Sequence, residues 1–199
     1  MSFSHYLVDL AKIFVSSSII NNIILIQFLG LCSYIGLTDN MSSSIGMSFA
    51  VIFVTVSSSI LTWVIDHWIL IPSHLQPVLQ ITSFILVIGS FVGLVQIYLK
   101  KASPNLYKAM GIYLPLIATN CIILGVTFIN SMNNYDFIQS IVEAIGISLG
   151  YTLAMLMLAG IRERLRNSDV PQFFKGKAIA FMISGILALA FLGFQGMIK

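Results

Sequence analysis

Long apolar runs, separated by short polar links, dominate the pattern of this chain. Each run is continuous rather than alternating. Each is about as long as the roughly 20 residues that an α-helix needs to cross a bilayer, whereas strands of a membrane barrel are shorter and alternate in polarity. The pattern therefore predicts an all-α integral membrane protein with six transmembrane helices, at residues 13–37, 41–65, 78–99, 109–130, 137–161 and 178–198.

The composition agrees with this pattern. Of the 199 residues, 58% are hydrophobic and 9% are charged, and the mean hydropathy is +0.98. A soluble domain carries about a quarter charged residues, so we predict a single membrane domain over residues 1–199. The net charge of +3 forms no basic patch for nucleic acid. We expect no cleavable signal peptide, because no positively charged segment precedes the first apolar run.

The basic residues predict the orientation of the chain. Most of the ten lysines and arginines lie in two links, at residues 100–108 and 162–177. Two spans separate these links, so both lie on the same side of the membrane. The positive-inside rule makes that side cytoplasmic, which places both termini outside. The segment Arg162–Arg166 is also a candidate docking site for a cytoplasmic partner.

Six spans divide into two halves of three, at about residues 1–100 and 101–199. The second half must enter the membrane from the side opposite to the first, so any likeness between the halves makes an inverted repeat. One likeness is present. The first span of each half holds one of the two cysteines, Cys32 and Cys121, each within a Cys-x-x-x-Gly motif. We therefore predict a 3 + 3 inverted repeat.

The first helix of each half is predicted to be interrupted. Cys121 falls near the middle of its span, whereas a straight first helix would place Cys32 near the cytoplasmic end. The two thiols reach one depth only if the first helix is broken, tilted or partly unwound. Gly30 and the pair Asn21–Asn22 are the candidate positions for that break, and Pro115 is the breaker before the second cysteine.

The two cysteines are the main candidates for chemistry. Two thiolates are half of the four ligands of an iron–sulfur cluster or a structural zinc. The three histidines, His5, His67 and His74, fall at the outer face or beyond it. Three hypotheses stay open from the residues alone. The cysteines are half of a metal site completed by another chain, small buried hydrophobes in a structural scaffold, or part of a substrate site in a small secondary transporter.

Other polar residues inside the predicted spans allow two interpretations. Glu143 is the only carboxylate well inside a span, where an acid suggests function, although it lies close enough to the outer end to reach water. Asn21, Asn22, Gln27 and Asn120 either hydrogen-bond between helices or line a site for an ion or for thiolates.

Small residues recur at a spacing of four in two spans, as Gly89 with Gly93 and Gly146 with Gly150. Such pairs let membrane helices approach closely, so we predict that they serve packing. The sequence contains no nucleotide-binding glycine loop and no Ser/His/Asp or zinc-protease motif. If the protein takes part in redox chemistry, substrate binding therefore falls to another subunit.

Recognisable motifs occur at Asn21–Asn22 with Phe28–Cys32, Trp68–Pro72, Ser103–Tyr107, Gly111–Ile117 with Thr119–Cys121, Ile161–Leu165, Asp169–Pro171 and Phe174–Gly176. Along essentially the whole chain, these motifs resemble those of the A subunit of the Rnf electron-transport complexes. The E subunit of the Na⁺-translocating NADH:quinone reductase shares the cysteine motifs and is the alternative, but Trp68–Pro72 and the Ser103-Pro104 step look more like the Rnf member. Ser33-Tyr34 departs from a commoner Pro-Phe pair.

The resemblance implies a membrane subunit of an ion-translocating ferredoxin:NAD oxidoreductase in a bacterial inner membrane, with periplasmic termini. It implies a homologous partner, the Rnf E subunit, alongside the B, C, D and G subunits. Each of the two homologues would give two cysteines to one intramembrane [2Fe–2S] cluster, and here the ligands would be Cys32 and Cys121. Electron flow through that cluster would drive Na⁺ or H⁺ across the membrane.

Overall fold

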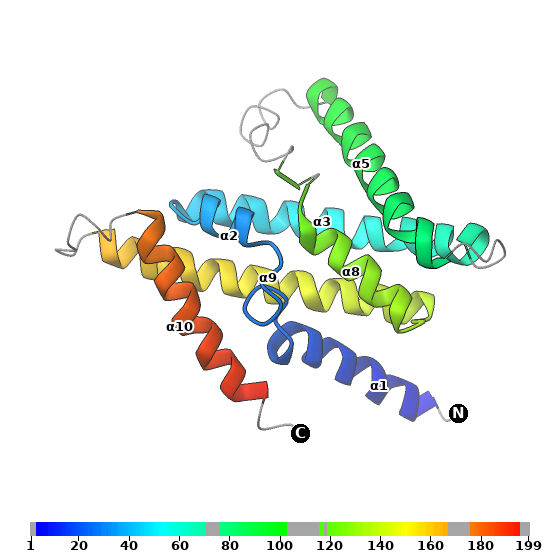
Figure 1. Ribbon diagram of the computed structural model, residues 1–199, viewed down its shortest axis with the longest axis horizontal. Coiled ribbons are helices and arrows are strands. Elements are labelled where there is room, and N and C mark those ends of the chain that lie inside the picture. Colours follow the sequence, from blue (N-terminus) through cyan, green and yellow to red (C-terminus); the bar gives the residue numbers. More distant parts are fainter. Residues whose placement is uncertain (1–2, 71–75, 103–115, 118, 167–175, 196–199) are drawn as a thin grey trace. The chain divides into compact units, whose positions relative to one another are not determined.

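A computed structural model gives the structure of the chain and describes residues 3–70, 76–102, 116–117, 119–166 and 176–195 (Figure 1). These residues form helices and connecting turns, and none of them is in a strand. The elements are α1 (Phe3–Val15), the π-helical η1 (Ser16–Ile20), α2 (Leu31–Leu37), α3 (Met41–Ile65), the π-helical η2 (Asp66–Leu70), α5 (Gln76–Ala102), α8 (Cys121–Met132), α9 (Phe137–Arg166) and α10 (Lys177–Gln195).

The helices confirm the all-helical membrane character that the apolar runs predict. Within the described residues, three stretches are long and apolar enough to cross a bilayer, at Met41–Trp68, Gln80–Tyr98 and Phe137–Arg166. Two shorter apolar helices extend over Cys121–Met132 and Lys177–Gly193. The count of six spans, their arrangement as a 3 + 3 repeat and the single domain stay predictions.

Two of the expected links are partly helical. Helix continues from α3 through η2 to Leu70, because no glycine or proline occurs there before Pro72. At the other link, α9 continues to Arg166. Basic side chains in the last turn of a helix interact favourably with its negative end, and Arg164 and Arg166 occupy that turn. Much of the basic segment is therefore the end of a helix rather than a loop.

The predicted interruption of the first span is confirmed. Helical structure ends at Ile20, and Asn21 has φ −101° and ψ 55°. The chain stays non-helical until α2 begins at Leu31. Gly30, directly before α2, has φ +84°, a left-handed conformation that glycine adopts without steric cost.

The second cysteine segment is also broken directly before its cysteine. Asn120 has an extended backbone, with φ −74° and ψ 115°, and α8 begins at Cys121. The predicted breaker Pro115 and the first part of the span 109–130 lie outside the described residues.

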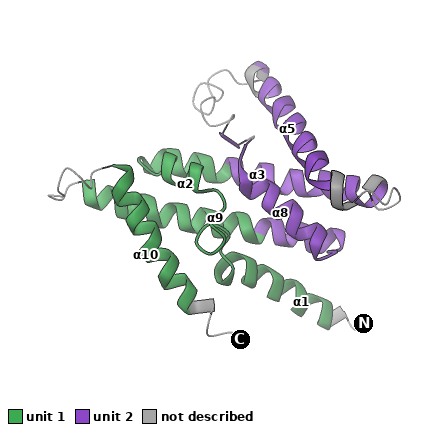
Figure 2. Ribbon diagram, in the orientation of Figure 1, with its two compact units in different colours: residues 1–49, 146–199 green, residues 50–145 purple. Residues whose placement is uncertain are grey.

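The chain divides into two compact units (Figure 2). Unit 1 comprises residues 1–49 and 146–199, and unit 2 comprises residues 50–145. In unit 1, α10 contacts α2 and η1; in unit 2, α5 contacts α8 and η2.

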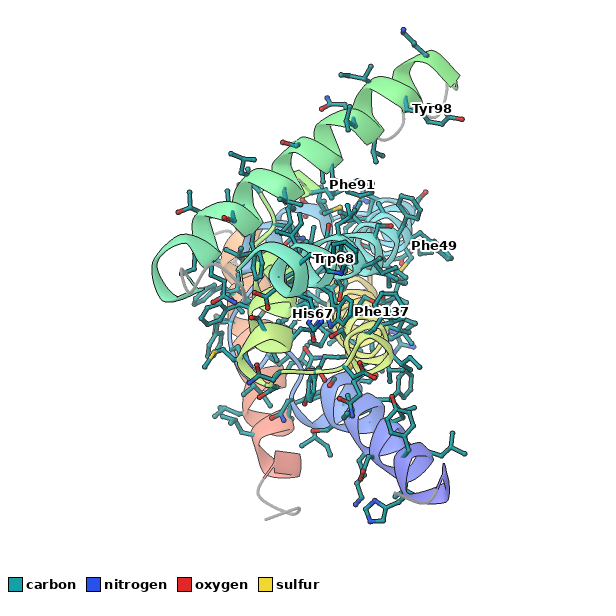
Figure 3. All side chains as sticks on the ribbon, turned by 90° about the vertical axis from the view of Figure 1, so that its right-hand side faces the viewer. Phe49, His67, Trp68, Phe91, Tyr98 and Phe137 are labelled. Atoms are coloured by element: carbon teal, nitrogen blue, oxygen red, sulfur yellow. The ribbon has the colours of Figure 1, made fainter. Side chains whose placement is uncertain are left out.

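Each unit also has a helix with large exposed apolar side chains. In unit 1, α10 exposes Phe181, Met182, Ile186, Leu189 and Leu192. In unit 2, α5 exposes Ile81, Ile85, Leu86, Leu94, Ile97 and Tyr98, and Tyr98 projects from one end of the helix (Figure 3). Such faces suit contact with lipid or with another membrane helix.

Candidate functional site

Cys32 occupies the first turn of α2 in unit 1, and its side chain is exposed. The next two residues, Ser33 and Tyr34, are fully buried. Cysteine is among the residue types most often buried, so a cysteine that faces outward beside two buried neighbours is unusual. The thiol of Cys32 is therefore presented to whatever covers this surface of the unit.

Two hydrogen bonds fix the start of α2. Ser33 Oγ donates to the carbonyl of Gly30 at 3.0 Å. Tyr151 in α9 donates its hydroxyl hydrogen to Ser33 Oγ at 3.1 Å, and Tyr151 is fully buried. A buried tyrosine therefore holds the turn that carries the neighbouring cysteine.

Asn22 supplies hydrogen bonds to the non-helical segment before α2. Its Nδ2 donates to the carbonyl of Gly150 at 2.7 Å. Its Oδ1 accepts from the backbone N–H groups of Ile24 at 3.2 Å and Leu25 at 3.4 Å. Unwound backbone at membrane depth must find such partners within the protein. Of the two interpretations of Asn22, inter-segment hydrogen bonding is confirmed.

The glycine pair of α9 serves close packing, as predicted. A Cβ at Gly150 would lie 2.6 Å from the backbone oxygen of Ser18, and a Cβ at Gly146 would lie 3.2 Å from the backbone oxygen of Phe14. By contrast, a Cβ at Gly89 or at its partner Gly93 in α5 would meet open space. Within the described residues, that second pair has no packing role.

Arg162 fixes the other end of α2, a role that the sequence reasoning missed. One guanidinium nitrogen donates to the carbonyl of Ile35 at 3.1 Å and to Thr38 Oγ1 at 2.8 Å. The other forms an ion pair with Asp39. The Arg162 residue is only 8% exposed, so it is not merely a surface charge that sets orientation. The sequence contained a signal for this ion pair, because the predicted topology puts the link with Asp39 and the link with Arg162 on the same side of the membrane.

Cys121 is the first residue of α8 in unit 2, and its side chain is partly exposed. Asn120 caps the helix, since its Oδ1 accepts from the N–H of Ile122 at 3.2 Å. Asn120 is only 3% exposed, and its Nδ2 has no hydrogen-bond partner among the described residues. A buried amide donor without an acceptor is costly, and this one belongs to the residue directly before the thiol.

Glu143 lies in α9 and is buried. It is only 6% exposed, so the interpretation that its side chain extends to solvent is wrong. Tyr135 lies in the turn before α9. Burial raises the pKa of Tyr135, and the negative charge of Glu143 raises it further.

Neither cysteine lies within a complete metal site among the described residues. No group of three or more His, Cys, Asp or Glu side chains gathers there in a way that could hold a metal ion. His5 approaches Asp9 at 3.3 Å, and His67 stacks on Trp63. His74 lies outside the described residues. A metal group at either thiol would therefore need ligands from beyond these neighbours.

The chain is similar to a known protein family and to several named proteins. The family described as "Rnf-Nqr subunit, membrane protein" matches residues 10–198. The chain is 48% identical to the A subunit of the proton-translocating ferredoxin:NAD(+) oxidoreductase complex of Clostridium ljungdahlii, over 94% of this chain and 96% of that protein. It is 46% identical to the A subunit of the Na(+)-translocating ferredoxin:NAD(+) oxidoreductase complex of Acetobacterium woodii, over 93% and 96%.

A third relative is the A subunit of the ion-translocating oxidoreductase complex of Azoarcus sp., which is 45% identical over 91% of this chain and 93% of its own length. The family match and these three alignments all extend over nearly the whole chain. The sequence resemblance to the Rnf members is therefore confirmed. This chain belongs to the Rnf-Nqr family of membrane subunits.

Proposed function

We propose that this chain is the A subunit of an ion-translocating ferredoxin:NAD⁺ oxidoreductase complex. The observation that carries the proposal is the near-full-length similarity to subunits of that name, at 45–48% identity. In this role the chain is a membrane subunit of a redox enzyme that does not itself bind the soluble substrates. The complex couples electron transfer to movement of Na⁺ or H⁺.

Cys32 and Cys121 are the proposed ligands of a [2Fe–2S] cluster, which supplies one-electron transfer when bound. The thiolates suit iron, and two of them are half of a ligand set. Each cysteine lies in the first turn of a helix that follows non-helical backbone. Backbone N–H groups at a helix start favour thiolate over thiol. The unpartnered Nδ2 of Asn120 is a donor of the kind that stabilises metal-bound sulfur.

The remaining residues of the site hold the two thiols in position. In unit 1, α2 is fixed at its start by Tyr151 through Ser33 and at its end by Arg162. In unit 2, Asn120 fixes the start of α8. Metal ligands tolerate little displacement, so these contacts would hold each sulfur in the position that a cluster requires.

The other half of the ligand set would come from the homologous Rnf E subunit, with the B, C, D and G subunits completing the complex. The exposed apolar faces of α5 and α10 offer surfaces for that partner and for lipid. We further propose six spans in a 3 + 3 inverted repeat, in a bacterial inner membrane with both termini periplasmic. The basic last turn of α9 agrees with a cytoplasmic end for that helix.

Removing the chain tests this function. Membrane vesicles with and without the chain are given reduced ferredoxin and NAD⁺, and both NADH formation and Na⁺ or H⁺ uptake are followed. We expect both activities to disappear without the chain and to return when it is supplied. As a matched control, Ser42→Ala at an exposed position of α3 should restore them equally. Full NADH formation without the chain would contradict the proposal.

A further inference from the structure

Unit 2 contains a cavity of about 380 Å³, whose lining includes neither cysteine. It lies where η2 follows α3, where α8 ends and where α9 begins. Trp63 forms one wall: its ring stacks on His67 with centroids 5.0 Å apart and meets Phe137 edge-on at 5.1 Å. The polar side chains used in the argument below are Ser59, Thr62, Asp66, Asn130, Ser131 and Asp136, and all of them line the cavity.

The serine and threonine hydroxyls of the lining present oxygen lone pairs rather than hydrogens. A hydroxyl has one hydrogen to donate and two lone pairs, and here the hydrogen is already committed. The committed bonds run from Thr62 Oγ1 to the Ser58 carbonyl at 2.7 Å, from Ser59 Oγ to the Ser140 carbonyl at 3.2 Å, and from Ser131 Oγ to Asp66 Oδ2 at 2.7 Å.

Two acceptor oxygens of the lining have no donor. Asp66 Oδ1 and Asn130 Oδ1 are buried and have no hydrogen-bond partner among the described residues. Asn130 is only 7% exposed. Its Nδ2 donates to Ser59 Oγ at 2.9 Å, which fixes the amide and leaves Oδ1 as its unpartnered atom. Buried acceptors without partners are costly, and positive charge would satisfy both.

The electrostatics of the cavity favour a cation. Its described lining holds two carboxylates, Asp66 and Asp136, and no lysine or arginine. The C-terminal end of α8, which carries partial negative charge, lies at the cavity. The N-terminal end of α9 carries partial positive charge, which offsets the negative charge of Asp136 directly before it. The charge of Asp66 is not offset in this way. Glu143, whose charge helps to raise the pKa of the lining residue Tyr135, adds to the negative potential.

We propose that this cavity binds a monovalent cation of sodium size, with Asp66 Oδ1 and Asn130 Oδ1 as its protein ligands. Hard cations take oxygen ligands, and Ca²⁺ sites draw on several carboxylates. No group of three or more His, Cys, Asp or Glu side chains that could hold a metal ion gathers among the described residues. The two proposed ligands together carry one negative charge, which matches a cation with a single positive charge. Cation binding in this cavity goes beyond the proposed function. Only a role of the cavity in ion transport would rest on the proposed function.

The test uses the full chain in its assembled complex, purified in detergent. Bound ²²Na⁺ and thermal stability are measured as NaCl replaces choline chloride at constant ionic strength. We expect Na⁺ to stabilise the wild-type protein. Asp66→Asn should remove one bound Na⁺ per chain or weaken its affinity at least tenfold. Asp9→Asn, which makes the same change of charge on a partly exposed acid of α1, should leave Na⁺ binding unchanged.

A charge swap completes the test. Asn130→Asp should tighten Na⁺ binding, and the double variant D66N/N130D should regain what Asp66→Asn loses. If Asp66→Asn does not assemble, Asn130→Asp decides, and an unchanged Na⁺ affinity in that variant overturns the proposal. Equal Na⁺ binding by wild type and Asp66→Asn also overturns it, since the carboxylate of Asp66 would then contribute nothing to Na⁺ binding. Ferredoxin-dependent NADH formation, measured on the same preparation, separates failure of this site from failure of the proposed function.

Discussion

Gly150→Ala should loosen the packing that positions the first cysteine segment. A Cβ there would lie 2.6 Å from the backbone oxygen of Ser18 and 3.3 Å from the Cα of that residue. Comfortable contacts lie at about 3.5–4.0 Å, and backbone atoms cannot rotate away. The η1 segment must therefore shift, which also strains the 2.7 Å bond from Asn22 to the Gly150 carbonyl.

The magnitude follows from three terms. Overpacking costs about 1–3 kcal/mol, and weakening the hydrogen bond costs about 1 kcal/mol. Replacing glycine by alanine inside a helix returns about 1 kcal/mol. The net loss for Gly150→Ala is therefore about 1–3 kcal/mol of unfolding free energy. The measurement is thermal unfolding of the assembled complex in detergent, compared with wild type.

The same helix offers graded controls. At Gly146 the nearest atoms to a Cβ are 3.2 Å away, so Gly146→Ala should change stability by less than about 1 kcal/mol, because propensity offsets the tighter contact. At Gly160 the nearest atom is Met41 Cε at 3.9 Å, so Gly160→Ala should be neutral or slightly stabilising. If Gly150→Ala proves as stable as Gly160→Ala, the close approach of η1 to α9 is refuted.

Two further substitutions probe the ends of the cysteine helices. Arg162→Lys should destabilise the protein by about 1–2 kcal/mol, because one ammonium cannot reproduce the guanidinium bonds to Ile35 and Thr38 together with the Asp39 pair; unfolding no easier than in wild type would contradict this. Asn120→Asp keeps the capping oxygen but replaces the amide donor with a carboxylate oxygen, so the cluster should become harder to reduce. Redox titration checks this, and an unmoved potential would show that the Nδ2 group is not directed at the cluster.

Periodicity and breakers were enough to predict much of the fold. The apolar run at 41–65 matches α3, and the break before α2 extends from Asn21 to Gly30, the positions that the sequence offered for it. These are local effects, so they can be read from neighbouring residues. The spacing of Gly146 and Gly150 likewise predicted a close approach of another segment, but it did not predict which segment approaches.

The missed features depend on contacts between residues far apart in sequence. Arg162 resembles any positive charge after a membrane span until its bonds to the Ile35 carbonyl and Asp39 are known. Glu143 is near enough to the end of its helix for water, and only tertiary packing buries it. The unpartnered Oδ1 of Asn130 could not be inferred either, because it depends on which donors the fold brings close.

The central claim is that Cys32 and Cys121 hold part of a [2Fe–2S] cluster. The most direct measurement is iron content and EPR of the reduced complex, purified without oxygen, from wild type and from Cys32→Ala and Cys121→Ala variants. We predict that each variant loses the [2Fe–2S] signal and two irons per complex, while other iron centres keep theirs. A full-strength [2Fe–2S] signal in either variant would contradict the claim.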